Sequence, residues 1–310
     1  MTKLPAELPR IEYHTHRVRT DDGVDLCVQS AGAGPAVLLV NGIGVCSPGL
    51  DFVAAQLLPR QRVISWDYRG MGQSRLDRWP VAMDMPRHAR DGLRILDALG
   101  EPAAAVLGWS MGVPVALEMI RAAPARVAAL GALFGAPGQP FRTAFPRPVA
   151  ALVHAFVHLA RVAPQPAQAL LDGAVMLPEA TWAVCTLTGF CGRTAHRAIW
   201  EEHVRSTRNA DKRAYFGSMA AMMEHDASDV LPAVRCPTLV VAGANDWVTP
   251  PRAAAAMAAT IPGARLVTLP ATSHFGVIEH GPELWEPLDA LLAAAGWDGA
   301  AAGAAAGPRR

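Results

Sequence analysis

A serine between two glycines is the clearest chemical signal in this sequence. The segment Gly-Trp-Ser-Met-Gly at 108–112 follows an apolar run at 104–109 and precedes a helical pattern at 111–122. A serine in a sharp strand-to-helix turn exposes its hydroxyl at the helix N-terminus, where the helix dipole favours developing negative charge. Glycines on either side have no Cβ, so neighbouring backbone can pass close to the turn. We therefore predict that Ser110 is a nucleophile.

Two alternating patterns surround this turn and must position it. Short apolar runs bounded by glycine, proline or charge are typical of strands buried on both faces of a parallel sheet. These runs lie at 36–40, 62–67, 104–109, 127–134, 238–243 and 264–269. The helical patterns between them lie at 50–58, 84–99, 111–122, 250–259 and 282–294. With a predicted hairpin at 12–30, they indicate an α/β fold, a mostly parallel central sheet with helices on both faces.

The alternation stops at Pro137 and resumes at Thr238. Five helical patterns separated by proline and glycine fill the interval. They lie at 148–161, 166–174, 178–186, 194–209 and 211–225. This interval holds five of the eight Phe and five of the ten His residues, so we expect it to determine specificity. The predicted division is a core of 1–136 and 231–297, a helical lid insertion at 137–230 and a disordered tail at 298–310.

Composition and charge argue against several classes of function. The chain has 310 residues, 51% of them hydrophobic, and a formal net charge of +1. This balance argues against a nucleic-acid partner or an anionic membrane surface, and the apolar stretches are too short and interrupted to span a bilayer. Five cysteines share no metal-ligand spacing, and the N-terminus has no apolar signal-peptide core. We expect a cytoplasmic protein without metal or organic cofactor; the sequence leaves the oligomeric state open.

The serine turn in this setting resembles that of the α/β-hydrolase family, and the resemblance covers about residues 20–295. In that family the chain order is serine, acid, histidine, which implies Asp246 as the acid and His274 as the base. The histidine would take the serine proton, and the acid would fix its tautomer and stabilise the imidazolium. Two alternatives remain open: Asp246 could cap the following helix, and His280 lies close enough in sequence to compete as the base.

The resemblance also implies an oxyanion hole and an apolar acyl pocket. One oxyanion donor would be the Met111 N–H, and the other would come from the loop after 36–40. Many family members have His-Gly in that loop, whereas this chain has Asn-Gly-Ile-Gly at 41–44, so we assign the second donor to the Ile43 N–H. The residues expected to line the pocket are Ile43, Cys46, Trp109, Met111, Phe190, Met223, Phe275 and Val277.

Three further motifs have structural interpretations. The segment 67–74 resembles the D-x-R-G-x-G-x-S turn of the family, in which we expect Asp67 to pair with Arg69. His154 and His158 lie four positions apart on a predicted helix, a spacing that could place two imidazoles on one metal. Because no third ligand is visible at a sensible spacing, we interpret them as part of an amphipathic helix. The segment Glu-Glu-His at 201–203 is interpreted as a solvated helix face.

Together these features predict a serine hydrolase that acts through an acyl-enzyme on Ser110. Its small-molecule substrate would be an ester, thioester or lactone with an apolar acyl part. Within the fold, the alternatives are a polyhydroxyalkanoate depolymerase-like enzyme, favoured by the Asn-Gly-Ile-Gly loop, a perhydrolase or haloperoxidase-like enzyme, a carbon–carbon bond hydrolase or an acyltransferase. A ligand-binding receptor that retains the fold is the alternative from another class. Dehalogenases and epoxide hydrolases are disfavoured because those relatives have Asp where this chain has Ser110.

Overall fold

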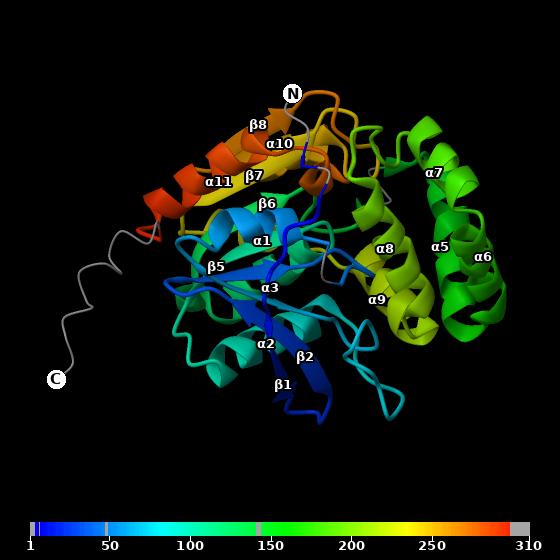
Figure 1. The fold of residues 1–310 in the computed structure, drawn as a ribbon, viewed down its shortest axis with the longest axis horizontal. Helices are drawn as coiled ribbons and strands as arrows, with labels where there is room; N and C mark the ends of the chain where they lie inside the picture. The colour runs from blue at the N-terminus through cyan, green and yellow to red at the C-terminus, as the bar shows by residue number, and fades with distance from the viewer. Residues whose placement is uncertain (1–3, 6, 47–48, 141–143, 298–310) are drawn as a thin grey trace.

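A central sheet of eight strands organises the molecule (Figure 1). The computed structural model describes residues 4–5, 7–46, 49–140 and 144–297, and the tail predicted at 298–310 lies outside the described residues. In sheet order the strands are β1 (His14–Arg19), β2 (Asp25–Ala31), β4 (Arg62–Trp66), β3 (Ala36–Val40), β5 (Ala104–Trp109), β6 (Val127–Leu133), β7 (Thr238–Gly243) and β8 (Arg265–Leu269). Strands β1, β2 and β4 pair antiparallel, and the remaining pairs are parallel.

Helices cover both faces of this sheet. They are α1 (Asp51–Leu57), α2 (Met85–Ala98), α3 (Gly112–Ala122), α10 (Pro251–Thr260) and α11 (Pro282–Ala294). Short 3₁₀ helices occupy Pro124–Arg126, Ser228–Ala233 and Gly276–Ile278. The fold is therefore the predicted α/β class, with a mostly parallel sheet between two helical layers.

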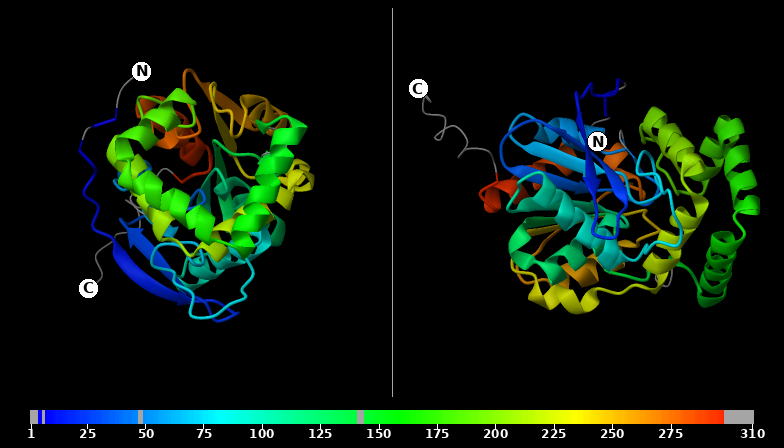
Figure 2. Two further views of the ribbon diagram at one scale, coloured as in Figure 1. Left: turned by 90° about the vertical axis from the view of Figure 1, so that its right-hand side faces the viewer. Right: turned by 90° about the horizontal axis from the view of Figure 1, so that it is seen from below.

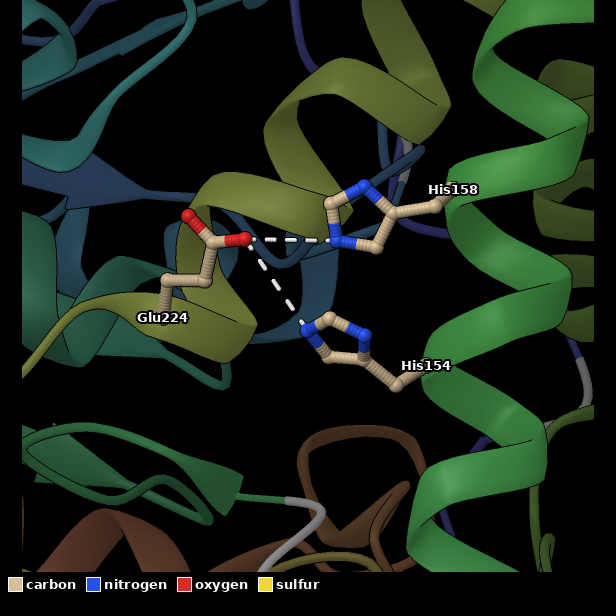
Figure 3. Close-up of side chains that lie close together, drawn as sticks. All are labelled: His154, His158 and Glu224. Carbon is tan, nitrogen blue, oxygen red and sulfur yellow. Dashed lines mark ion pairs between the residues drawn. The ribbon is translucent and has the colours of Figure 1, made fainter.

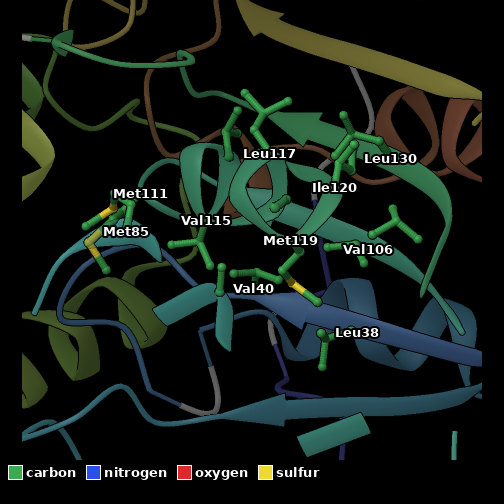
Figure 4. Packing of buried hydrophobic residues seen from close by; sticks show 14 of the residues in the cluster. Leu38, Val40, Met85, Val106, Met111, Val115, Leu117, Met119, Ile120 and Leu130 are labelled. Atoms are coloured by element: carbon green, nitrogen blue, oxygen red, sulfur yellow. The ribbon is translucent and has the colours of Figure 1, made fainter. Parts of the chain in front are cut away.

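Strand β3 shows why the apolar runs in the sequence are continuous. All five of its residues are buried. Leu38 and Val40 belong to the apolar cluster beneath α2, α3 and α10, which Figure 4 shows around Met119. Val37 and Leu39 belong to the cluster beneath α1 and α11. Because successive side chains of a strand point to opposite faces, a strand covered on both sides needs an apolar residue at every position.

Between β6 and β7 the described residues include five long α-helices, which Figures 1 and 2 show together beyond one end of the sheet. They are α5 (Arg147–Val162), α6 (Gln165–Met176), α7 (Pro178–Leu187), α8 (Arg197–Asn209) and α9 (Lys212–Glu224), close to the ranges expected from the sequence. The chain enters and leaves through a narrow neck, where Gly138 and Asp226 form an antiparallel bridge. A Cβ on Gly138 would lie 2.3 Å from the His225 carbonyl oxygen, so the close approach of the two chain segments requires glycine.

The outer helices of this insertion expose many large apolar side chains. Those on α5–α7 and their connections are Val149, Leu152, Phe156, Leu159, Val162, Leu170, Met176, Leu177, Val184 and Leu187. Within the described residues, no single helix is both long enough and apolar enough to span a membrane. The pair α6 and α7 reaches this length and apolar character only when taken together, and it is bent by 100°.

The turn after β4 is held by a buried ion cluster that differs from the expected pairing. Asp67 accepts a hydrogen bond from the Gln73 N–H at 2.8 Å, and the expected pair with Arg69 is wrong. The fully buried Arg69 guanidinium instead donates to Asp91 at 2.5 and 2.8 Å and to Asp22 at 2.6 and 2.8 Å. These bidentate contacts join the β1–β2 hairpin, the turn and α2, so Arg69 compensates its burial with carboxylates from distant segments.

Candidate active site

Ser110 occupies a strained turn between β5 and α3. Its φ of 55° lies in the left-handed region, which a non-glycine residue seldom adopts. A Cβ on Gly112 would lie 2.0 Å from the Val40 carbonyl oxygen, and one on Gly108 would lie 2.4 Å from the Gly112 carbonyl oxygen. Both flanking glycines are therefore required by close backbone contacts. The Ser110 N–H donates to the Leu133 carbonyl at 3.0 Å, which attaches the turn to the end of β6.

The three residues expected to act together converge at the carboxyl ends of β5, β7 and β8. His274 Nε2 lies 2.8 Å from Ser110 Oγ, and His274 Nδ1 lies 2.9 Å from Asp246 Oδ2. His274 and Asp246 are both buried. A carboxylate at Nδ1 keeps the proton on that nitrogen and leaves Nε2 free to accept one from the serine hydroxyl.

Asp246 is held by its own loop. Its Oδ1 accepts hydrogen bonds from the backbone N–H groups of Val248 and Thr249 at 2.9 and 2.8 Å, and its Oδ2 accepts one from Thr249 Oγ1 at 2.7 Å. The alternative that Asp246 caps the next helix is wrong, because the N-cap residue of α10 is Pro250. His280, the other candidate base, instead contacts Thr272 Oγ1 through its Nε2 at 2.6 Å.

Glu279 supports the histidine loop and was missed by the sequence analysis. Its buried carboxylate accepts hydrogen bonds from the Ser273 N–H at 3.0 Å and from the Gly192 N–H at 2.9 Å, and Ser273 Oγ also donates to it. A Cβ on Gly192 would lie 2.6 Å from the same carboxylate. Glu279 thus connects the residue before His274 to the insertion. Nothing in the sequence marks Glu279 for this role, because the contact with Gly192 joins residues that are 87 positions apart.

The loop after β3 lies against the serine turn. A Cβ on Gly42 would be 3.4 Å from Ser110 Cβ, which shows how closely this loop approaches. Asn41 holds the loop with its side-chain amide, which donates to Ser65 Oγ at 3.2 Å and to the Trp66 carbonyl at 3.3 Å. Among the described residues, none accepts a hydrogen bond from the backbone N–H of Ile43 or of Met111. Both donors are therefore available to a bound oxygen.

An apolar cavity of about 360 Å³ opens at Ser110 and His274. Of the expected wall residues, it is lined by Ile43, Trp109, Phe190 and Phe275. The insertion adds walls from α5 and α6 (Val153, Phe156, Val157, Ala167, Leu170 and Leu171) and from α9 (Tyr215, Phe216, Met219 and Met222). The cavity lies between the sheet and the insertion and presents mainly hydrocarbon to a bound molecule.

Four expected wall residues lie elsewhere. Cys46 lines a separate, polar cavity, where its Sγ accepts a hydrogen bond from Ser206 Oγ at 3.1 Å, and burial raises the pKa of this thiol. Met223 is one position beyond Met222, and the helical rotation of about 100° turns it away from the cavity. Val277 and Met111 are buried in the two apolar clusters of the core. These are corrections to the predicted pocket.

His203 was expected on a solvated face, and the structure corrects this. It is only partly exposed, lines the cavity and packs edge-on against Phe275 with ring centroids 5.5 Å apart. Burial, together with the charge of the nearby His274, lowers the pKa of His203 to about 4. His203 is therefore neutral near pH 7 and adds no positive charge beside His274. The sequence placed it next to two glutamates and gave no sign of this burial.

Comparison with known proteins agrees with this geometry. Residues 35–281 match the family described as alpha/beta hydrolase fold, and the chain belongs to that family. The predicted fold class and the expectation of an enzyme of this family are confirmed.

Individual relatives include both large and small proteins. The chain is 32% identical over 284 residues to the polyketide synthase ThaQ of Burkholderia thailandensis, with 87% of this chain matched to only 12% of that protein's length. It is 27% identical over 259 residues to a pimeloyl-[acyl-carrier protein] methyl ester esterase of Chromobacterium violaceum, covering 83% of this chain and 94% of the esterase. A hydrolase from Pseudomonas aeruginosa PA01 superposes with a TM-score of 0.71 at 27% identity, covering 90% of this chain and 98% of the other.

Proposed function

We propose that this protein is a serine hydrolase that cleaves an ester, thioester or lactone with an apolar acyl part. The observation that carries the proposal is the continuous chain of contacts from Ser110 Oγ through the His274 ring to Asp246, in which Ser110 and His274 line the apolar cavity. Such a chain is the arrangement that activates a hydroxyl for attack on a carbonyl carbon.

In the proposed reaction, Ser110 Oγ attacks the substrate carbonyl while His274 Nε2 takes its proton. The resulting imidazolium is stabilised by Asp246, whose carboxylate is already oriented by its loop. The oxyanion accepts hydrogen bonds from the backbone N–H groups of Ile43 and Met111. His274 then protonates the leaving group, and an acyl-enzyme remains on Ser110. A water molecule, deprotonated by His274, releases the acid by the same steps in reverse.

The lining of the cavity favours a substrate with an apolar acyl group. Its walls are aromatic and aliphatic, and each methylene transferred from water into such a site contributes about 0.8 kcal/mol. We propose that the helical insertion acts as a lid, because it supplies the wall opposite the sheet. The carbonyl would then lie at Ser110, with the acyl chain extending toward α5, α6 and α9.

The proposal is tested with the Ser110→Ala variant. Hydrolysis of p-nitrophenyl esters and labelling by a fluorophosphonate probe should both occur in the wild-type protein and be lost in the variant, with kcat lowered by at least ~10³-fold. The side chain of Ser110 is small and its turn is held by backbone contacts, so circular dichroism and the unfolding midpoint should change little.

Ser228→Ala is the matched control, because Ser228 is an exposed serine outside the cavity. It should retain full hydrolysis and labelling. Labelling that persists in Ser110→Ala would show that another residue is the nucleophile. Wild-type protein that binds an apolar ester without turning it over would favour the ligand-binding alternative.

A further inference from the structure

Three side chains of the insertion that can bind metals converge on one point (Figure 3), and none of them lines the cavity at Ser110. His154 and His158 lie one turn apart on α5, and Glu224 is the last residue of α9. Glu224 Oε1 lies 3.2 Å from His158 Nε2 and 3.9 Å from His154 Nε2. The ligand atoms of all three side chains lie within 4.8 Å of one another.

These distances suit a transition-metal ion. Zinc binds imidazole nitrogen and carboxylate oxygen at about 2.0–2.2 Å, so two ligands on a tetrahedral ion lie about 3.4 Å apart. The observed nitrogen-to-oxygen separations bracket that value. Two imidazoles and one carboxylate suit ions of intermediate softness, whereas calcium and magnesium prefer oxygen ligands alone.

The site is open to solvent, and its buried nitrogen faces the carboxylate. His158 Nε2 is buried and makes no hydrogen bond to the described residues; its polar neighbour is Glu224 Oε1 at 3.2 Å, so a cation between the two atoms would be bound by both. The side chains of His154 and Glu224 are 46% and 61% exposed. Both line an open cavity of about 810 Å³ from which water could complete the coordination. The cation on the same wall, Arg147, belongs to the first turn of α5, about 10 Å along the helix from His154.

We propose that His154, His158 and Glu224 bind one transition-metal dication of the zinc class, with water in the remaining position. This site is separate from the serine chemistry. The ion would tie α5 to α9, and both helices carry walls of the apolar cavity, including Val153 and Met219. Its expected effect is to stabilise the packing of the insertion and to hold two walls of the cavity together.

Metal titration of the whole protein tests the site. After removal of metals with a chelator, the wild-type chain should bind one equivalent of Zn²⁺ by calorimetry. It should also bind Co²⁺ with the visible absorption of a four-coordinate ion, and saturating Zn²⁺ should raise the unfolding midpoint. A double variant, His154→Ala with His158→Ala, should bind at least ~100-fold more weakly, because even loss of an outer partner costs 10–100-fold. It should lose the thermal shift as well.

Two further variants keep the result interpretable. His14→Ala removes an exposed histidine of β1 and should bind like the wild type. Glu224→Gln keeps the side-chain size and should weaken binding and alter the Co²⁺ spectrum. Unchanged one-to-one binding in the double variant would overturn the site, as would failure of the folded wild-type protein to bind either ion. Wild-type binding in Glu224→Gln would overturn the three-ligand assignment.

Discussion

At Ser110, the supporting hydrogen bonds act on its two partners, His274 and Asp246. Thr249 and two backbone N–H groups orient Asp246, and Asp246 orients His274. Glu279 holds the residue that precedes His274. Such supporting hydrogen bonds matter because a misplacement of about 1 Å at a reacting group can cost 100-fold in rate. The geometry of the proposed site therefore depends on residues other than the proposed reacting groups.

Glu279→Gln should reduce activity without removing any proposed reacting group. The amide keeps the volume of the carboxylate, but it accepts fewer hydrogen bonds and points one donor toward the N–H groups of Ser273 or Gly192. We expect a loss of about 1–3 kcal/mol in unfolding free energy and a fall in kcat of roughly 10-fold. Urea unfolding and ester kinetics measure the two effects. Glu286→Gln, at an exposed position of α11, should match the wild type; if Glu279→Gln also does, the positioning role is wrong.

At the scale of elements, α2 of the core packs against α9 of the insertion, and we call this contact the joint. His88 of α2 lies fully buried in this joint, with its Nε2 3.2 Å from Ser218 Oγ of α9. Its ring packs edge-on against Tyr68, with centroids 4.7 Å apart. Burial, reinforced by the positive charge of Arg69, lowers the pKa of His88 to about 3. The joint therefore requires a neutral imidazole.

Acid should weaken this joint. The unfolded chain binds a proton at His88 near pH 6.5, whereas the folded chain does so only near pH 3. The contribution of His88 is therefore fully present above about pH 6.5 and is lost as pH falls toward 3, by up to about 1.4 kcal/mol per pH unit. Urea unfolding at pH 7, 6, 5 and 4.5 measures this slope. His88→Gln keeps a hydrogen-bonding group without the titration and should show a shallower slope; parallel curves would contradict the prediction.

At the scale of the whole molecule, the cavity belongs to neither the sheet nor the insertion alone. Trp109 is the last residue of β5 and Phe275 lies in the segment after β8, whereas Leu171 and Met219 come from inserted helices. These residues are far apart in the sequence. They line one cavity because the chain segments that bridge at Gly138 and Asp226 place the insertion over the ends of the strands. Acyl-chain selectivity should consequently respond to changes on α6, in a helix distant from Ser110 in the sequence.

Leu171→Trp should shorten the acyl chain that the cavity accepts. The larger ring fills space at the α6 wall, and each methylene that no longer fits loses about 0.8 kcal/mol, roughly fourfold in kcat/KM. Acetyl esters should be hydrolysed almost normally, whereas octanoyl esters should be hydrolysed much more slowly, which a p-nitrophenyl ester series measures. Leu187→Trp introduces the same ring at a position of α7 that is 74% exposed and should leave selectivity unchanged. Equal loss for all chain lengths would place Leu171 outside the acyl site.

Much of the architecture followed from local sequence pattern. The strand β3 is apolar at every position because both faces are covered, and the helices of the insertion begin and end near the predicted residues. The turn at Ser110 was predictable for the same reason, since its glycines and flanking elements are adjacent in the chain. Asp246 and His274 followed from chain order, and the structure brings both to Ser110.

The sequence by itself determined the elements and the residues whose chemistry depends on their immediate neighbours. Only the tertiary structure decided contacts between segments far apart in the chain. Arg69 pairs with Asp22 and Asp91 across the hairpin and α2, and His158 meets Glu224, 66 positions away, on another helix. The reason is that hydrogen bonding and periodicity within one helix or strand depend on residues close in the sequence. The partner of a buried charge or of an imidazole depends instead on which segments pack against each other.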